Sequence, residues 1–209
     1  MSRLVDRAAV NDTRLQTAFN SANGRWFCAV SHHGRADKPI LPMDTVTIES
    51  INQTDVEQFV ELLGGIYEHS PWVAKRCYAE RPFHSVEELQ EAMKQTVEDA
   101  SNAEQLALLR AHPDLGSSAE LTEASEAEQE AAGLDRLTPD QYETFQQLNR
   151  QYHDKFEFPF IMAVKHESTD AIQEAMEDRL EHSRETEFRT ALKEVHTIAA
   201  IRLEELLAA

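Results

Sequence analysis

The sequence is poor in the residues that build disulfide-rich and β-rich proteins. It has two cysteines, Cys28 and Cys77, and six glycines among 209 residues. Two cysteines exclude a disulfide framework and a cysteine-rich zinc module. The scarcity of glycine, together with abundant Glu, Gln, Ala and Leu, favours helices over a β-sandwich. We expect a protein of a reducing compartment, and therefore a cytoplasmic one.

Basic residues and long apolar runs are also scarce. Twenty Lys and Arg stand against 38 Asp and Glu, which gives a formal net charge of −18. Nucleic-acid binding needs basic patches that neutralise phosphates, and an anionic membrane surface repels an acidic protein. No apolar run approaches the roughly 18 to 20 residues that span a bilayer. The sequence therefore predicts neither a nucleic-acid partner nor a membrane partner.

The charge is unevenly distributed along the chain. Residues 1–42 contain six bases and three acids, so they carry +3 and the remaining residues carry about −21. This first segment has no sustained helical period and no signal-peptide apolar stretch. Turn and breaker residues at 21–24 and 38–42 predict loop. We expect a disordered tail over residues 1–42, or a translated upstream stretch that is foreign to the functional protein.

The acidity from Met43 onward has two interpretations. One is a solvated surface that keeps the protein soluble. The other is adaptation to high salt, where screening removes the self-repulsion of such a surface. We favour the second interpretation, which concerns habitat rather than chemistry.

Apolar residues recur at helical spacing from Met43 onward, and helix-start signals precede most of the periodic stretches. The clearest signal is Thr-Pro-Asp-Gln at residues 138–141, which combines a cap, a proline at the first helical position and a capping-box glutamine. We expect helices over residues 56–63, from 71, and over 85–99, 102–110, 138–152, 168–180 and 185–206. Residues 158–164 are a short apolar run, either a buried extended piece or a helix start. The predicted class is all-α, with one compact domain over residues 43–209.

Arg202 interrupts the apolar stripe of the last predicted helix. At about 100° per residue it falls in the same sector as Leu192, Val195 and Ala199. A buried guanidinium is costly unless it finds an anionic partner. Arg202 therefore snorkels or pairs with a local carboxylate, or it binds an anionic substrate. For the substrate role we expect Arg202→Met to abolish activity and leave stability nearly unchanged, because methionine fills the stripe with apolar volume.

Two further polar features lie in the irregular middle of the chain. His112 precedes Pro113 at the start of a loop, where a histidine with a pKa of about 7 is a natural general acid or base. A surface or capping histidine would give the same pattern. Residues 125–128 have the spacing of a capping box, which alone would explain them. The histidines lack metal-ligand spacing, so zinc is not expected.

Several motifs occur in a characteristic order. They are LGGIYEHSPW at 63–72, HPDLG at 112–116, SEAEQ at 125–129 followed by GL at 133–134, LNRQY at 148–152, KFEFPFI at 155–161 and RETEF at 184–188. Each motif alone is weak, but together, over about residues 47–207, they resemble the 2-oxo-4-hydroxy-4-carboxy-5-ureidoimidazoline (OHCU) decarboxylase family. The resemblance implies an all-helical enzyme without metal or other cofactor, usually a homodimer. Its implied substrate is a small ureidoimidazoline of urate breakdown.

The resemblance also implies roles for particular residues. The family's catalytic histidine, glutamate and C-terminal arginine correspond to His112, Glu128 and Arg202. The substrate-binding positions correspond to Pro113, Ser125, Glu126, Ala127, Glu128, Gln129, Phe160, Ile161, Met162, Ala163 and Val164. Two departures stand out: residues 1–42 have no counterpart, and Glu157 stands where the family usually has glycine, which puts the backbone of that turn in question.

The implied reaction is decarboxylation to (S)-allantoin. His112 would handle the hydroxyl proton and reprotonation, Glu128 would orient the hydroxyl, and Arg202 would stabilise developing negative charge. The alternatives are an inactive helical binding or regulatory module of the same fold, and a hydrolase acting on ureides of the same pathway. Whether His112, Glu128 and Arg202 converge on one pocket distinguishes an active site from an inactive module.

Overall fold

The computed structural model describes residues 16–20, 25–29, 46–117 and 121–208. The chain divides into two units, Met1–Pro42 and Met43–Ala209, and each is described by itself. In the first unit, β1 (Gln16–Asn20) pairs antiparallel with β2 (Arg25–Ala29), with Gln16 opposite Ala29. These strands are a correction to the irregular structure predicted there. They contain strand-forming residues such as Phe19 and Trp26, in runs too short to show as a periodic pattern. The rest of the predicted tail lies outside the described residues.

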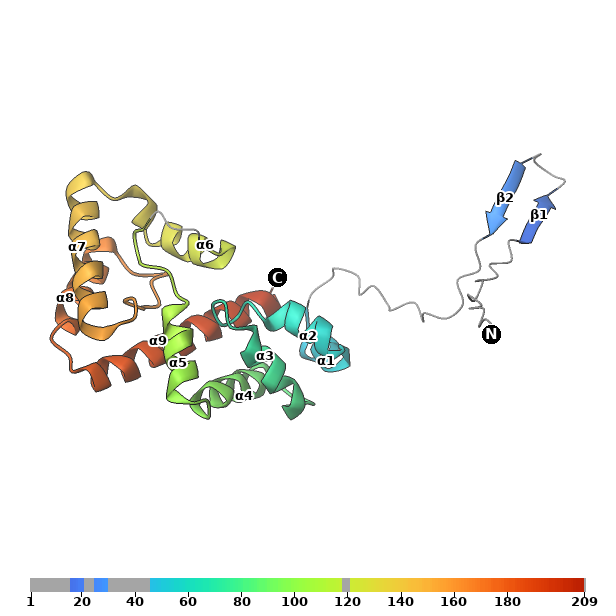
Figure 1. Ribbon diagram of the computed structural model, residues 1–209, viewed down its shortest axis with the longest axis horizontal. Helices are drawn as coiled ribbons and strands as arrows, with labels where there is room; N and C mark the ends of the chain where they lie inside the picture. The colour runs from blue at the N-terminus through green and yellow to red at the C-terminus, as the bar shows by residue number, and fades with distance from the viewer. Residues whose placement is uncertain (1–15, 21–24, 30–45, 118–120, 209) are drawn as a thin grey trace, which may run out of the picture. The chain divides into compact units, whose positions relative to one another are not determined.

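The regular elements in the described part of the second unit are all helices (Figure 1), and this confirms the predicted all-α class. Its helices are α1 (Ile48–Gln53), α2 (Val56–Leu63), α3 (Pro71–Cys77), α4 (Val86–Glu98), α5 (Asn102–Arg110), α6 (Glu123–Ala131), α7 (Pro139–Phe156), α8 (Thr169–Arg179) and α9 (Arg184–Ala208). Two 3-10 turns lie at Tyr78–Glu80 and Leu134–Arg136. Among the helices of the described residues, none is long and apolar enough to cross a membrane.

The helix starts follow from the sequence signals. Thr138 accepts a hydrogen bond from the Gln141 N–H, and the Gln141 side chain accepts one from the Thr138 N–H, so α7 begins with the predicted capping box. Pro139 occupies the first helical position. Proline lacks an N–H, and an N–H at this position would have no acceptor within the helix. Ser85 likewise caps α4 by accepting from the Glu88 N–H. Local chemistry therefore sets most of the helix boundaries.

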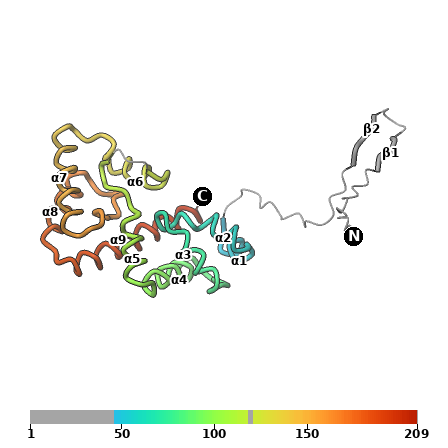
Figure 2. Tube along the Cα trace, viewed as in Figure 1, coloured from blue at the N-terminus to red at the C-terminus, as the bar shows by residue number. Residues whose placement is uncertain are grey.

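The long helix α9 is the element on which the other helices of this unit assemble. It runs through the middle of the unit in Figure 1, from the lower left to the C-terminus, and the trace in Figure 2 follows the same path. It contacts α4, α5 and α7, which come from separate parts of the chain. Its buried face includes Leu192, Val195, Ala199 and Leu203, the apolar stripe that also contains Arg202.

The segment after α7 is extended rather than helical, which settles the alternative left open by its composition. Residues 159–164 belong to no helix or strand, yet Phe158, Phe160, Ile161 and Val164 are buried. The ring of Phe160 packs edge-on against Tyr152 of α7, with centroids 5.4 Å apart. Apolar burial therefore fixes the path of a segment that has no regular backbone ladder.

Glu157 ends α7 in a left-handed conformation, with φ of 67° and ψ of 19°. This conformation favours glycine, so the turn keeps the backbone that the family's usual glycine would adopt. The Glu157 carbonyl accepts a hydrogen bond from Arg110 Nε at 2.8 Å, and its carboxylate pairs with Arg184. The surrounding arginines therefore stabilise a glutamate at a strained position.

The first unit should be dispensable for folding, because the described buried residues of Met43–Ala209 form a hydrophobic core among themselves. A protein that begins at Met43 should unfold with the same midpoint as the full chain and keep full activity. Thermal unfolding followed by circular dichroism tests this expectation. Loss of cooperative unfolding in the shorter protein would contradict it.

Candidate functional site

A pocket lies between the loop after α5, helix α6, the extended segment after α7, and α9. It is lined by His112, Pro113, Leu115, Ser125, Glu128, Gln129, Phe160, Ile161, Met162, Val164, Ile198 and Arg202. The cavity among these side chains has a volume of about 30 Å³ and is partly open to solvent. His112, Glu128 and Arg202 therefore converge on one pocket.

Arg202 is 7% exposed and is fully engaged by the side chains around it. Its Nε and Nη2 donate to the two carboxylate oxygens of Glu128 at 2.7 and 2.8 Å. Its Nη1 donates to Glu68 at 2.7 Å, and Nη2 also donates to Ser125 Oγ at 3.1 Å. Burial opposes the charge, but the bonds and charges of Glu128 and Glu68 outweigh it and raise the pKa of Arg202. The Arg202 guanidinium is thus a permanent cation in one fixed orientation.

Glu68 is the residue of this site that the sequence analysis missed. It lies in the loop between α2 and α3 and is 2% exposed. Besides Arg202, it accepts hydrogen bonds from Thr122 Oγ1 at 2.8 Å and Ser125 Oγ at 2.9 Å. Burial alone would raise the pKa of Glu68. The hydrogen bonds from Arg202, Thr122 and Ser125, together with the charge of Arg202, outweigh burial, so the pKa lies below its ordinary value. The sequence signal that could have indicated a buried Glu68 is its position directly after the apolar residues Ile66 and Tyr67.

His112 follows the end of α5 and is held by the last turn of that helix. Its Nδ1 lies 3.0 Å from the carbonyl oxygen of Leu108. Because a carbonyl only accepts, this bond requires the proton on Nδ1 and leaves Nε2 with a free lone pair. Burial lowers the pKa of His112 to about 4. The imidazole is therefore neutral at neutral pH and able to accept a proton.

The loop that follows His112 is fixed by side chains from two helices. The Gly116 N–H donates to Gln129 Oε1 of α6 at 2.9 Å, and Asn149 Nδ2 of α7 donates to the Leu115 carbonyl at 3.0 Å. Gly116 has a φ of 66°, and a Cβ there would lie 3.0 Å from Leu137. The predicted substrate-binding residue Gln129 thus also supports the loop.

Helix α6 brings only part of the predicted segment 125–129 to the pocket. Ser125, Glu128 and Gln129 line it, whereas Glu126 and Ala127 are exposed on the opposite face. The helical period separates them, because positions one and two after an inward-facing residue point outward. The placement of Glu126 and Ala127 in the substrate site is thereby corrected.

The start of α6 also differs from the predicted capping box. Thr122, not Ser125, is the cap, because its hydroxyl accepts from the Ser125 N–H at 3.3 Å. Ser125 lies in the first turn, where its hydroxyl is free to bind Glu68 and Arg202. The capping interpretation of residues 125–128 is therefore wrong, since an equivalent cap lies three residues earlier.

The extended segment supplies the apolar wall of the pocket. Phe160, Ile161, Met162 and Val164 line the pocket. Ala163 does not, and its N–H instead donates to Glu194 Oε2 of α9 at 2.9 Å. The predicted substrate contact of Ala163 is therefore replaced by a contact that anchors the wall.

A family model described as OHCU decarboxylase matches residues 52–204. The chain belongs to the OHCU decarboxylase family. Within the helical unit, the described residues contain no group of three His, Cys, Asp or Glu side chains that could hold a metal ion.

Individual relatives agree with this assignment. The chain is 62% identical over 164 residues to a protein of Halalkalicoccus jeotgali named 2-oxo-4-hydroxy-4-carboxy-5-ureidoimidazoline decarboxylase, covering 78% of this chain and 93% of that one. It is 60% identical over 163 residues to a protein of the same name from Haloferax volcanii, covering 78% and 97%. A crystal structure of (S)-allantoin synthase superposes with a TM-score of 0.65 at 34% identity, covering 78% of this chain and 54% of that one.

The pairing of Arg202 changes the expected result of Arg202→Met. The sequence analysis expected stability to be nearly unchanged, but the substitution leaves Glu68 buried without its cation. Removing one partner of a buried pair costs about 3 to 5 kcal/mol of unfolding free energy. We expect a loss of this size, measured by urea unfolding, and partial recovery when Glu68→Gln is added.

Arg76→Met is the matched control, because Arg76 pairs with Glu104 at the surface. An exposed pair contributes about 0 to 1 kcal/mol. If Arg202→Met is no more destabilising than Arg76→Met, the buried pairing does not stabilise the fold.

Proposed function

We propose that the protein decarboxylates OHCU to (S)-allantoin without a cofactor, in urate degradation. The convergence of His112, Glu128 and Arg202 on one pocket, in a chain of the OHCU decarboxylase family, carries this proposal. The inactive-module alternative has no observation in its favour, because all three chemical groups are present and paired.

The reaction needs an electron sink, and the substrate contains one. Cleavage of the bond to the carboxylate releases carbon dioxide, and the electron pair left behind forms a double bond to the neighbouring ring carbon while the imine nitrogen takes up a proton from solvent. The hydroxyl then becomes a carbonyl as its proton leaves, and a proton is added to the neighbouring ring carbon. The face of that addition fixes the handedness of the allantoin.

Each side chain has a role that matches its surroundings. His112 accepts the hydroxyl proton at Nε2, the nitrogen left free by the bond of Nδ1 to Leu108. Glu128 orients the hydroxyl, and Arg202 stabilises the negative charge that develops on the ring. Glu68 keeps the guanidinium in place before substrate arrives, so no reorganisation is needed during the reaction. The wall at Phe160, Ile161, Met162 and Val164, together with Pro113, Ser125 and Gln129, encloses the ring and the ureido group.

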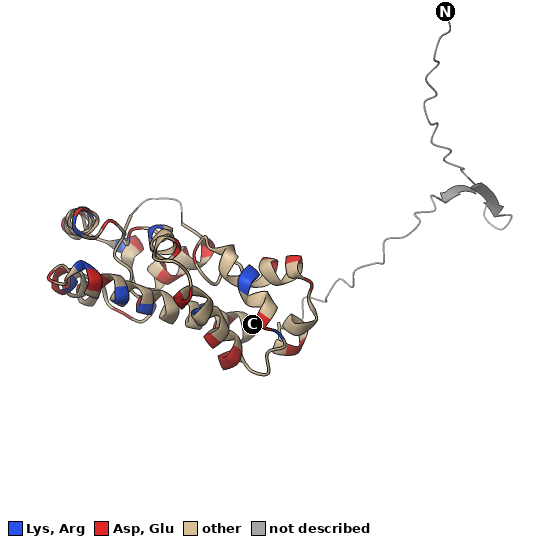
Figure 3. Ribbon diagram, turned by 60° about the horizontal axis from the view of Figure 1, so that its bottom comes forward, with Lys and Arg blue, Asp and Glu red and all other residues tan. Residues whose placement is uncertain are grey.

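The assembly and location are further proposals. The family resemblance supports a homodimer, and the presence of only two cysteines supports a cytoplasmic protein. We also propose that the acidic surface is an adaptation to high salt, because Asp and Glu are spread over many helices of the second unit (Figure 3).

Circular dichroism on freshly generated OHCU tests the activity, because enzymatic (S)-allantoin gives an optical signal and spontaneous decay does not. Wild type should give the signal, and His112→Asn should lower kcat about 10² to 10⁴-fold with a smaller change in substrate binding. Because burial lowers the pKa of His112 to about 4, wild-type kcat/KM should stay level from neutral pH down to mildly acidic pH and fall as the pH approaches that value.

Two results would count against this function. No optical signal from wild type would exclude the reaction. A His112→Asn protein with wild-type kcat would remove His112 from the proton transfer. Glu128→Gln is a complementary variant that removes the charge and keeps the shape, so we expect its kcat to drop as well.

The salt proposal predicts a thermal midpoint that rises as KCl increases from about 0.2 to 2 M, because screening weakens repulsion between surface carboxylates. A variant with Glu130, Glu143 and Glu174 changed to glutamine, all exposed, should show a smaller rise. A midpoint that is independent of salt in both proteins would contradict the proposal.

A further inference from the structure

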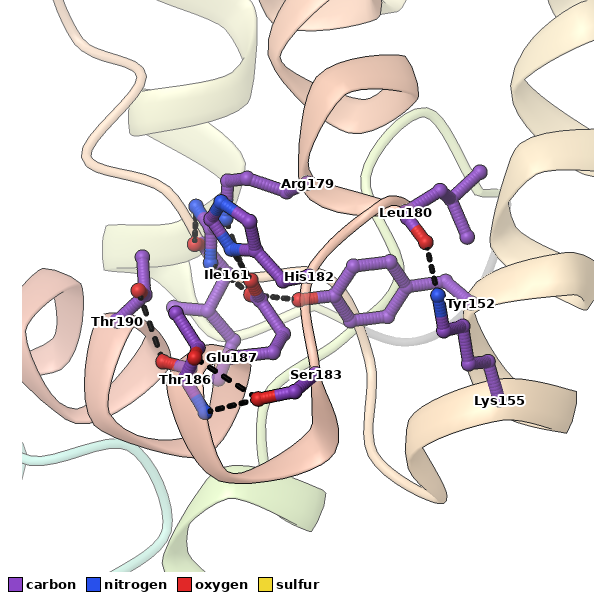
Figure 4. A network of polar contacts seen from close by, with 10 residues as sticks. All are labelled: Tyr152, Lys155, Ile161, Arg179, Leu180, His182, Ser183, Thr186, Glu187 and Thr190. Carbon is purple, nitrogen blue, oxygen red and sulfur yellow. Dashed lines mark hydrogen bonds and ion pairs between the residues drawn. The ribbon is translucent and has the colours of Figure 1, made fainter.

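A second buried polar cluster lies outside the pocket, around Glu187 in the first turn of α9 (Figure 4). Glu187 has no exposed surface, and Arg179 at the end of α8 is 8% exposed. Arg179 donates to Glu187 Oε1 through Nε at 3.0 Å and through Nη2. The hydroxyl of Tyr152 donates to the same oxygen, and His182 Nδ1 lies 2.7 Å from Oε2. Both carboxylate oxygens are therefore engaged, and the guanidinium is held in one plane.

The remaining donor of Arg179 reaches the wall of the pocket. Its Nη1 donates to the carbonyl oxygen of Ile161 at 2.8 Å, as Figure 4 shows, and its guanidinium carbon lies 4.4 Å from the centre of the Phe160 ring. Phe160 and Ile161 both line the pocket. The cluster thus contacts the wall through residues that do not themselves line the pocket.

The wall depends on such contacts because it lacks a regular ladder of backbone hydrogen bonds. Residues 159–164 belong to no helix or strand. Its backbone is tied by two side chains, through the Ile161 carbonyl to Arg179 and through the Ala163 N–H to Glu194. Within the part of the chain that the structure describes, no acceptor contacts the N–H of Met162.

The geometry of the peptide bond connects these facts. In a trans peptide the C=O and the following N–H point in opposite directions. The bond that turns the Ile161 carbonyl toward Arg179 therefore turns the Met162 N–H away from Arg179. Met162 lines the pocket, and its N–H lies on the side of the peptide away from Arg179.

We propose that Arg179, held in place by Glu187, is a positioning residue of the active site, which fixes the peptide between Ile161 and Met162 so that the Met162 N–H binds the substrate. This inference rests on the proposed function, with an amide or ureido oxygen of the substrate as the acceptor. A buried ion pair is weak evidence of a contribution to stability, because apolar side chains often replace one without loss. Its contact with the wall gives this pair a role beyond stability.

Arg179→Lys tests the proposal, because lysine keeps the charge but replaces the planar guanidinium, whose three nitrogens reach Glu187 and Ile161 in a fixed geometry, with a single ammonium nitrogen. We expect KM for OHCU to rise about tenfold, the loss of roughly one well-aligned hydrogen bond, with a smaller change in kcat. Hydrogen–deuterium exchange of a peptide covering residues 158–166 should become faster, while exchange within α9 stays as in wild type. Glu187→Asp, which keeps the charge but shortens its reach, should shift both quantities in the same direction and serves as the second variant if Arg179→Lys does not fold.

Tyr152→Phe is the matched control. It removes one contact of Glu187, keeps the ring beside Phe160, and leaves the bond from Arg179 to Ile161 intact. Its KM and the exchange of residues 158–166 should remain close to wild type. If Arg179→Lys and Tyr152→Phe change KM and exchange equally, or if neither changes them, the cluster has no positioning role. If wild type does not turn over OHCU, the proposed function fails, and the exchange measurement still decides whether Arg179 orders the wall.

Discussion

A guanidinium buried in the last helix must be neutralised by carboxylates, and this requirement connects the fold to the site. Arg202 finds its partners in the loop after α2 and in α6, up to 134 residues away along the chain. Leaving any of these charges unpaired in the interior would be costly. The same bonds that satisfy Arg202 also place Glu128 and Ser125 at the pocket, so structural and chemical requirements are met by one set of contacts.

The irregular parts of the site are ordered by side chains from regular elements. Buried backbone groups must find partners, and neither the loop at residues 112–116 nor the wall at residues 159–164 has a ladder to provide them. Gln129 and Asn149 bind the first segment, and Arg179 and Glu194 bind the second. Residues that never touch a substrate can thus decide where the substrate-facing atoms lie.

The sequence predicted what local chemistry determines. Capping signals located α7, and the helical period showed Arg202 on an apolar stripe before any partner was known. Glu68 could not be found this way, because its partners are distant in sequence. Ser125 was assigned as a cap because Ser125 and Glu128 have the spacing of a capping box. Thr122 offers an equivalent hydroxyl three residues earlier, and local sequence does not distinguish the two. Glu126 and Ala127 were carried over from a contiguous motif, although a helix presents only some of its positions to one side. The strands β1 and β2 were missed because short runs give no periodic signal.

Helix α9 carries Glu187, which holds the wall through Arg179, Glu194, which binds the wall directly, and Arg202, which binds the carboxylates of the site. The three lie about two turns apart and on roughly one side of the helix. Insertion or deletion of a single residue between Glu187 and Arg202 would rotate one end relative to the other by about 100°. Substitutions on the outer surface of α9 are compatible with the site, but a change in the length of this interval is not.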